Sequence, residues 1–271
     1  MAFRAAQAQG RGMALKGYEH LFPVRGDESM HKRIAVTPDS TRCSTCMLSE
    51  ICLPIGMPRY DVEKLDELIK ERIRVPKGSA LFHLGDKTEA IYGIRSGSLK
   101  TQLQDASGQV QITGFLLPGE IAGMDGLLEY THVSNAVALE DSEVCVMRID
   151  DIDRLSLQLP VLQQQLRRLM SKEINRSQQM VMALGSLRSE QRLAAFLINL
   201  SQRLFVLGYS ASEFILRMSR EEIGNFLGLT LETVSRLFSR FAREGLIRVH
   251  QREVQILDMR ALQALAGTDC G

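Results

Sequence analysis

The chain has 271 residues, enough for two domains, with 45% hydrophobic and 24% charged residues, as in ordinary globular proteins. Its 33 Lys+Arg nearly balance its 32 Asp+Glu, which excludes a general polyanion binder and leaves room only for a local basic patch. The sequence contains no apolar run of roughly 18 residues and no apolar core after Arg4. We therefore expect a cytoplasmic protein without a membrane partner.

Residues 1–42 show no sustained hydrophobic period. Glycine and proline interrupt the stretch at Gly10, Gly12, Gly17, Pro23, Gly26 and Pro38. These residues break both helices and strands. We predict a mobile leader.

Residues 43–158 are expected to form a cysteine loop followed by a β-rich domain. A short helix is predicted over Val62–Glu71, with Val62, Leu65 and Ile69 on one side. Beyond it, β-like runs are separated by glycines; they are Ala80–Leu84, Ala90–Arg95, Gln109–Leu117 and Glu143–Ile149. This spacing favours a small antiparallel barrel or roll, and the whole chain is expected to be α+β.

Residues 159–185 carry a long helical period. Its apolar positions are Leu159, Leu162, Leu166, Leu169, Ile174, Met180 or Val181, and Leu184. Such a stripe packs either on its own domain or on a second copy of the helix, and its narrowness favours the homodimer. The expected interface consists of Leu162, Leu166, Leu169, Ile174, Ser177, Val181 and Leu184.

Residues 186–271 form a third, mainly helical block, with a helix expected over Glu190–Leu200. Within it, Ser219 and Glu222 have the spacing of a capping box that starts a further helix. Gly228 then supplies a tight turn, and Thr230 can cap the next helix. The buried stripe of that next helix is predicted to contain Leu231, Val234, Leu237 or Phe238, and Phe241.

The opposite face of that last helix is polar. Its polar positions are Glu232, Ser235, Arg236, Ser239 and Arg240, and together with Thr230 they are the residues expected to contact DNA, for the following reasons. Two helices joined by a glycine turn, with hydrogen-bonding groups at the start of the second, are typical of a helix-turn-helix. Arginine, carboxylate and hydroxyl groups can all read base edges in the major groove. Arg248–Ile256 is predicted to form a wing after it.

Three of the five cysteines lie within ten residues. Cys43, Cys46 and Cys52 can bind one side of a metal centre, and Cys145, expected at the end of a strand, is the candidate fourth ligand. Four thiolates suit either zinc or a [4Fe–4S] cluster, and the absence of a second close cysteine pair favours the cluster. Cys270 is expected to be a free thiol.

Four stretches closely resemble the FNR branch of the CRP/FNR transcription regulators. They are Gln111–Phe115, Leu169–Ile174, Gln191–Phe196 and Ile223–Thr230, within a similarity that extends from Cys43 to Gly267. The resemblance implies an oxygen-sensing, anaerobic regulator with a β-roll, a dimer helix and a winged helix-turn-helix. It also implies a [4Fe–4S] cluster on Cys43, Cys46, Cys52 and Cys145, which holds the dimer together without oxygen.

The same resemblance implies partners. Glu232, Ser235 and Arg236 would read the half-site TTGAT in double-stranded DNA, with the second subunit on its inverted copy. The loop Asp105–Gln111 is similar to a surface that contacts RNA polymerase. Where FNR proteins can carry an acid on the dimer helix, this chain has Ser177, which would ease dimerisation of the protein without its cluster.

Two rival functions are weighed against this one. A cyclic-nucleotide receptor of the CRP type would place an Arg-Ser pair after its Gly-Glu motif; here Gly119 and Glu120 are followed by Ser134 and Asn135. A buried phosphate would then lack a cation, so no cyclic nucleotide is expected. An iron–sulfur electron-transfer protein would leave the polar face of the second helix without a role. No grouping of catalytic residues suggests an enzyme.

Overall fold

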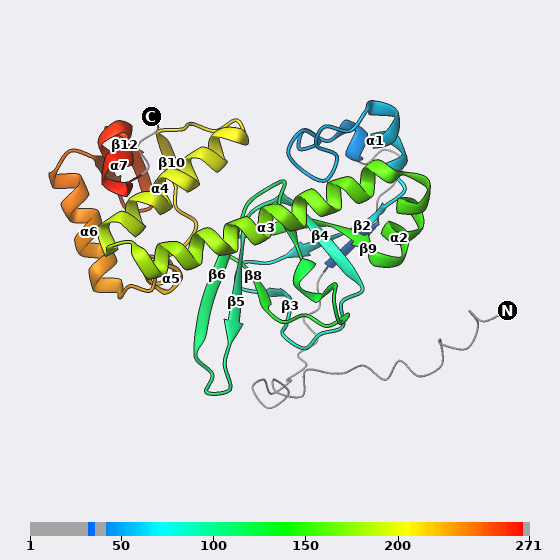
Figure 1. Cartoon of the computed structure of the whole chain (residues 1–271), viewed down its shortest axis with the longest axis horizontal. Helices are drawn as coiled ribbons and strands as arrows, with labels where there is room; N and C mark the ends of the chain where they lie inside the picture. The colour runs from blue at the N-terminus through cyan, green and yellow to red at the C-terminus, as the bar shows by residue number, and fades with distance from the viewer. Residues whose placement is uncertain (1–31, 36–41, 268–271) are drawn as a thin grey trace.

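The computed structural model describes residues 32–35 and 42–267, and it shows a β-roll joined by one long helix to a helical C-terminal unit (Figure 1). The first sheet of the roll has the strand order β1-β2-β9-β4-β7. These strands are β1 (Lys32–Ala35), β2 (Ile69–Val75), β9 (Ser142–Arg148), β4 (Ala90–Ser96) and β7 (Ile121–Ala122). All of their pairings are antiparallel.

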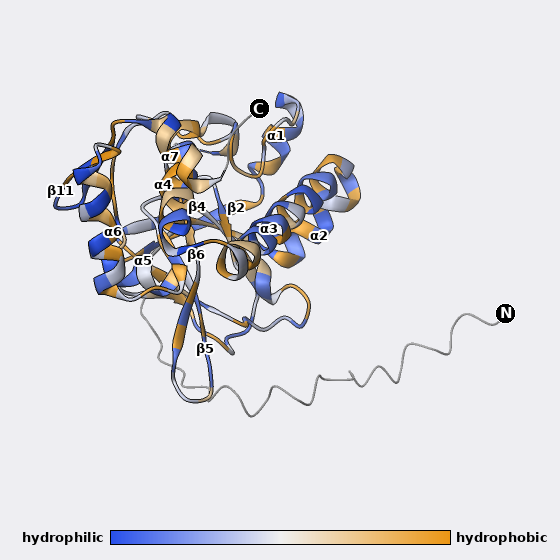
Figure 2. Ribbon diagram, turned by 60° about the vertical axis from the view of Figure 1, so that its left-hand side comes forward, coloured by the Kyte–Doolittle hydropathy of each residue, from blue (hydrophilic) through white to orange (hydrophobic). Residues whose placement is uncertain are grey.

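The second sheet of the roll has the order β3-β8-β5-β6. Its strands are β3 (Ala80–Phe82), β8 (Asn135–Ala138), β5 (Leu99–Gln104) and β6 (Val110–Leu116). The hairpin of β5 and β6 projects from the body of the molecule (Figures 1 and 2). A short 3₁₀ turn, η2 (Met124–Gly126), follows β7. The predicted antiparallel roll and α+β class are confirmed.

Apolar side chains of both sheets form the core of the roll. Ile73, Ile94, Leu99 and Val144 are among its buried members. Alternation along β9 sends Val144 and Val146 into this core and leaves Cys145 and Met147 for the outer face of the first sheet. A second core on that outer face therefore includes Met147 and the partly buried cysteines.

This outer face is covered by the cysteine loop with its 3₁₀ turn η1 (Cys43–Thr45), by helix α1 (Arg59–Leu65), by helix α2 (Ile149–Gln158) and by the first turns of the helix that follows α2. The helix predicted over Val62–Glu71 is thus displaced. It ends at Leu65, because Ile69 and the residues after it pair with β9 as strand β2.

The predicted leader also needs a correction. Within 1–42, Lys32–Ala35 form strand β1, which pairs with β2, so these four residues belong to the first sheet and not to a separate leader. Residues 1–31 and 36–41, to which the expectation of mobility also applied, lie outside the described residues. Cys145 lies in the middle of β9 rather than at its end.

Helix α3 (Pro160–Ser186) runs across the roll toward the C-terminal unit (Figure 1). Pro160 occupies its first turn, where a missing N–H costs no hydrogen bond. Hydrophobic and hydrophilic residues alternate along it (Figure 2). None of the helices in the described ranges combines the length and apolar character that crossing a membrane requires.

The C-terminal unit contains four helices and a three-stranded sheet. In chain order its elements are α4 (Ser189–Val206), β10 (Glu213–Ile215), α5 (Arg220–Leu227), α6 (Leu231–Arg243), β11 (Ile247–His250), β12 (Glu253–Ile256) and α7 (Met259–Ala266). Strands β11 and β12 are the predicted wing. The long α4 extends past the predicted end at Leu200.

The roll and the C-terminal unit share a core. The aromatic rings of Phe115 in β6, Phe196 in α4 and Phe226 in α5 contact one another, with centroids 5.0 to 6.0 Å apart. Asn225 of α5 also bonds to the free edge of β6: its Oδ1 accepts from Ile112 N, and its Nδ2 donates to Val110 O. These contacts set the C-terminal unit against the roll.

Candidate metal centre and nucleic-acid interface

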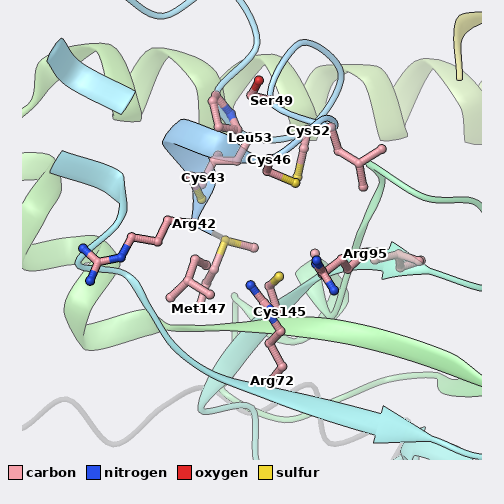
Figure 3. A pocket seen from close by; sticks show the side chains of 15 residues that line it. Arg42, Cys43, Cys46, Ser49, Cys52, Leu53, Arg72, Arg95, Cys145 and Met147 are labelled. Carbon is pink, nitrogen blue, oxygen red and sulfur yellow. The ribbon is translucent and has the colours of Figure 1, made fainter. Parts of the chain in front are cut away.

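The first candidate site is a pocket lined by four cysteines from two distant parts of the chain (Figure 3). Cys43, Cys46 and Cys52 belong to the loop before α1, and Cys145 projects from β9 toward them. Folding therefore brings together all four residues that the sequence suggested as ligands. Cys270, the fifth cysteine, lies outside the described residues.

Short-range hydrogen bonds shape the cysteine loop. The N–H of Cys52 donates to Leu48 O at 2.8 Å, which curls the chain back on itself. Asp66, just after α1, accepts from the N–H of Ser44 at 3.0 Å and from its hydroxyl at 2.5 Å. Asp66 thus fixes Ser44, which lies between Cys43 and Cys46. This role of Asp66 was not predicted from the sequence.

Gly93 leaves room for the pocket. It pairs with Cys145 across β4 and β9. A Cβ added at Gly93 would lie 3.7 Å from Cys52 Sγ and 3.5 Å from Met147 Cε, so a larger side chain would enter the space between the thiols. This role was also missed from the sequence, where the glycine is one of 21.

Burial makes the thiols weak acids. It raises the pKa of Cys43 strongly, helped by the nearby Cys52 and Cys145, and it raises the pKa of Cys52 to about 12. Burial also raises the pKa of Cys145, although Arg72 opposes the shift. Protein alone would keep these thiols protonated at neutral pH, whereas a bound metal would replace their protons.

Two arginines lie beside Cys145 on the strands that flank it (Figure 3). Arg72 pairs directly with Cys145 across β2 and β9, and Arg95 is two residues beyond Gly93 on β4. Both contact Glu143, at 3.6 Å for Arg72 Nη1 and 2.8 Å for Arg95 Nη1. Their positive charge suits a centre whose thiolates make it anionic.

Four cysteine thiols are a donor set that fits either a [4Fe–4S] cluster or a structural zinc ion. Among the described residues, no three His, Cys, Asp or Glu side chains converge on a position for a single metal ion. A structural zinc ion would need four ligands at about 2.0–2.3 Å from one point. The thiolates of a [4Fe–4S] cluster bind separate iron atoms and need not meet at a point.

The second candidate site is the exposed face of α6. The predicted capping box starts α5: Ser219 Oγ accepts from Glu222 N at 3.1 Å, and Glu222 Oε2 accepts from Ser219 N at 2.7 Å. Gly228 ends that helix with φ 63°, a left-handed conformation that suits glycine. Thr230 then caps α6 by accepting from Thr233 N at 3.2 Å.

The predicted burial of α6 holds for Val234, Leu237, Phe238 and Phe241. Leu231 is wrongly assigned to the buried stripe: it is 45% exposed, because the first turn of α6 extends beyond the core. The expected contacts Glu232, Ser235, Arg236, Ser239 and Arg240 are all exposed, as is Thr230.

Two of these side chains have defined local partners. Hydrogen bonds from its own backbone N–H and from Thr230 hold the pKa of Glu232 below its usual value, so it is an ionised acceptor. Arg240 bonds to Glu244 Oε1 at 2.7 Å and to Glu190 Oε2 at 2.5 Å, which ties it to the start of α4. Arg240 is therefore already paired with two carboxylates on the face that is expected to contact DNA.

The expected dimer stripe divides along α3. Leu162 is 0% exposed and packs in the outer core of its own roll, so its assignment to the interface is wrong. Leu166 and Leu169 pack partly against the same core. Farther along, Ile174 is 58% and Val181 71% exposed, with exposed Ser177 between them and half-buried Leu184 one turn on.

Glu120 of the Gly-Glu motif has hydrogen-bond partners within the chain, and so does the pair Ser134 and Asn135 that stands where a cyclic-nucleotide receptor would have Arg-Ser. Glu120 accepts from Leu117 N and from Arg203. Ser134 donates to Asp125 Oδ2 at 2.8 Å, and Asn135 Oδ1 accepts from Leu84 N at 2.9 Å. The groups that could meet a nucleotide are thus already bonded.

A β-roll, a long connecting helix and a winged helix-turn-helix with an exposed polar recognition face define a transcription regulator of the CRP/FNR class. Residues 191–265 match the Crp-like helix-turn-helix domain, and residues 72–158 match the cyclic nucleotide-binding domain.

Whole proteins agree with these matches. The transcriptional regulatory protein btr of Bordetella pertussis is 65% identical over 89% of this chain and 99% of its own length. The transcriptional activator protein anr of Pseudomonas aeruginosa is 46% identical over 83% of this chain and 92% of its own length. The structure of FixK2 from Bradyrhizobium japonicum covers 72% of this chain and 96% of its own, with 25% identity and a TM-score of 0.67. The chain belongs to the CRP/FNR family of transcription regulators.

Proposed function

We propose that this chain is a cytoplasmic, oxygen-responsive, anaerobic transcription regulator. In this proposal Cys43, Cys46, Cys52 and Cys145 hold a [4Fe–4S] cluster that controls dimerisation and binding to an inverted repeat of TTGAT. The observation that carries the proposal is the pocket that all four cysteines line together. Cys145 joins the three loop cysteines there although it is 93 residues from Cys52, the nearest of them in sequence. The name of the relative anr, an activator, supports a role in activation.

The chemistry of the site follows from its residues. A bound cluster would supply an oxygen-labile link between the four thiolates. The cysteine loop is then tied to β9, while Asp66 keeps its beginning in place through Ser44. Without that link, the loop retains the Asp66 contacts and its packing on the outer core, and Arg72 and Arg95 face neutral thiols. Loop and roll thus have two states of different rigidity.

Dimerisation would use the part of α3 that the roll leaves uncovered. Ile174, Ser177 and Val181 form an exposed strip there. Apolar side chains at this spacing can pack against the same strip of a second copy. A shift in the roll that tilts α3 by a small amount changes this contact, and a few kcal/mol suffice to move such an equilibrium.

DNA recognition would use α6 from each subunit. Arg236 can donate to both acceptors of guanine, and the ionised Glu232 can accept from cytosine. Two copies related by a two-fold axis read the two halves of an inverted repeat. The exposed tip of the β5–β6 hairpin, Asp105–Gln111, is the proposed contact for RNA polymerase.

The experiment combines two measurements on protein purified without oxygen. Its absorption spectrum and its iron, sulfide and zinc contents identify the metal centre, with about four iron and four sulfide per chain expected. A gel shift on the TTGAT inverted repeat is then run before and after exposure to air. Binding that is strong before air and weak after it supports the proposal; stoichiometric zinc, or equal binding in both samples, contradicts it.

A second candidate is a cyclic-nucleotide-responsive regulator, because the roll matches that domain. The internal bonds of Glu120, Ser134 and Asn135 weigh against it. Calorimetric titration with cyclic AMP distinguishes the candidates: heat of binding with unit stoichiometry would favour the receptor.

A further inference from the structure

Glu120 lies where three parts of the molecule meet. It stands in the turn between β6 and β7, and its carboxylate contacts Arg176 of α3 and Arg203 of α4. Arg203 Nη2 is 2.6 Å from Glu120 Oε2, Arg203 Nε is 3.1 Å from Oε1, and Arg176 Nη2 is 3.5 Å from Oε1. Both guanidinium groups also donate to Phe115 O, at 2.6 and 3.2 Å.

This ion cluster is mostly buried, which makes its charges consequential. Burial favours the neutral acid, yet Arg203 and Arg176 hold the pKa of Glu120 below its usual value. The second carboxylate oxygen also accepts from Leu117 N at 2.9 Å. Removing one member of such a group leaves a buried charge without compensation, so the members keep each other in place.

The other side of the same turn touches the cysteine loop. Gly119 has φ +84°, and a Cβ added to it would lie 3.0 Å from Cγ1 of Ile51, the residue before Cys52. Ile121 pairs with Gly93, and a Cβ at Gly93 would lie 3.7 Å both from Ile121 Cδ1 and from Cys52 Sγ. The turn Gly119–Ile121 is therefore packed between the cysteine pocket and the two arginines.

We propose that Glu120 is a positioning residue that transmits the state of the cysteine centre to the DNA-binding unit. When the cysteine loop is held against β9, Ile51 fixes the turn, and Glu120 then holds α3 and α4 in the arrangement that leaves α6 exposed. When the loop is released, the turn gains freedom and the two helices lose their common anchor. The inference rests on the proposed function, since it needs a centre with two states.

The chain offers a matched control. Glu140, before β9, contacts Arg217 Nε at 3.3 Å and so also joins the roll to the DNA-binding unit. Glu140 is outside the turn that Ile51 contacts. A variant at Glu140 removes an ion pair across the same boundary without interrupting the path from the cysteine loop.

The experiment compares wild type, Glu120→Gln, Arg203→Lys and Glu140→Gln, each full-length, in the cluster-loaded and metal-free forms. Fluorescence anisotropy gives the Kd for the TTGAT inverted repeat, and the ratio of metal-free to loaded Kd measures the coupling. We expect Glu120→Gln to lower this ratio at least tenfold with unchanged iron and sulfide content. Arg203→Lys should also lower this ratio, whereas Glu140→Gln should keep it within about twofold of the wild-type value.

Hydrogen exchange supplies a second readout that does not depend on DNA. In wild type, the amides of α4 should exchange faster in the metal-free form, whereas in Glu120→Gln both forms should exchange alike. If Glu120→Gln does not fold, as judged by circular dichroism, Arg203→Lys decides the question.

The outcomes separate the two proposals. A wild-type ratio near one contradicts the proposed function, and this inference with it. A large wild-type ratio that Glu120→Gln or a folded Arg203→Lys leaves unchanged overturns only the role of Glu120. An equal fall in Glu140→Gln would show general loosening of the boundary and would also overturn it.

Discussion

Cys145 projects to the outer face of the first sheet because its neighbours Val144 and Val146 fill the roll. Replacing it with serine should abolish the proposed [4Fe–4S] centre, since an alcohol is a poor ligand for iron at neutral pH. Iron and sulfide analysis of the anaerobically purified variant measures the loss. Cys270→Ser is the control and should retain the centre; a full iron and sulfide content in Cys145→Ser would contradict its assignment as a ligand.

Arg236 is exposed near the start of α6, with Thr233 Oγ1 3.3 Å from its Nη2. Arg236→Ala should weaken binding to the inverted repeat by about 1–3 kcal/mol and relax the preference at the guanine of the half-site. Competition binding with single-base variants of the site measures both effects. Equal weakening on specific and random DNA would mean that Arg236 contacts only phosphates.

Asp125 organises the turn before β8. One of its oxygens accepts from the N–H groups of Val133 and Ser134 at 3.1 Å, and the other lies 3.2 Å from Nδ1 of His132. Asp125→Ala should lower the free energy of unfolding by about 1–3 kcal/mol at pH 7, because buried donors lose their acceptor. Urea unfolding measures the change, with Asp153→Ala on the exposed face of α2 as the control.

The effect of Asp125 should depend on pH. Burial opposes ionisation, but bonds from His132 and Ser134 leave the pKa of Asp125 lowered. A lowered pKa stabilises the fold above the unfolded value of about 3.9, and this contribution is lost as the pH falls through the folded pKa. The difference between wild type and Asp125→Ala should therefore shrink below about pH 4; a constant difference down to pH 2 would contradict this account.

At the scale of elements, helix α3 has one part that packs on the roll and another that stays exposed. Its first turns pack on the roll through Leu162, whereas Ile174 and Val181 stay exposed. Ser177 interrupts the exposed strip. Ser177→Asp should place like charges close together across a dimer and make dimerisation depend more on the metal centre, whereas Ser177→Leu should extend the apolar strip and permit dimers in air.

Sedimentation of wild type and both Ser177 variants, each with and without the proposed metal centre, measures the dimer fraction. In the metal-free samples we expect the dimer fraction to be highest for Ser177→Leu, intermediate for wild type and lowest for Ser177→Asp. The same dimer fraction in all six samples would show that this part of α3 does not control assembly.

At the scale of the molecule, the aromatic contact among Phe115, Phe196 and Phe226 joins roll and DNA-binding unit. Phe115→Ala should lower the free energy of unfolding by about 3–5 kcal/mol, because the buried ring that packs against both units is lost. Thermal unfolding measures it. Phe205→Ala, on the exposed end of α4, should stay within about 0.5 kcal/mol, and a similarly small effect of Phe115→Ala would show that the units are independent.

The sequence by itself determined the features that depend on neighbouring residues. The capping box of Ser219 and Glu222, the left-handed Gly228 and the wing follow local rules of helix ends and turns, and all are present. The family resemblance and the α+β class also followed from the sequence, because short motifs and alternating strand patterns can be recognised without knowledge of the packing.

Only the tertiary structure decided which side chains are free and which distant groups meet. A periodic stripe cannot say that Leu162 faces its own roll, nor that Leu231 extends past the core, because burial depends on what packs opposite. The same holds for the contacts of Asp66, Gly93 and Glu120. They join residues up to 83 positions apart, as between Glu120 and Arg203, and such pairings exist only once the sheets and helices have been assembled.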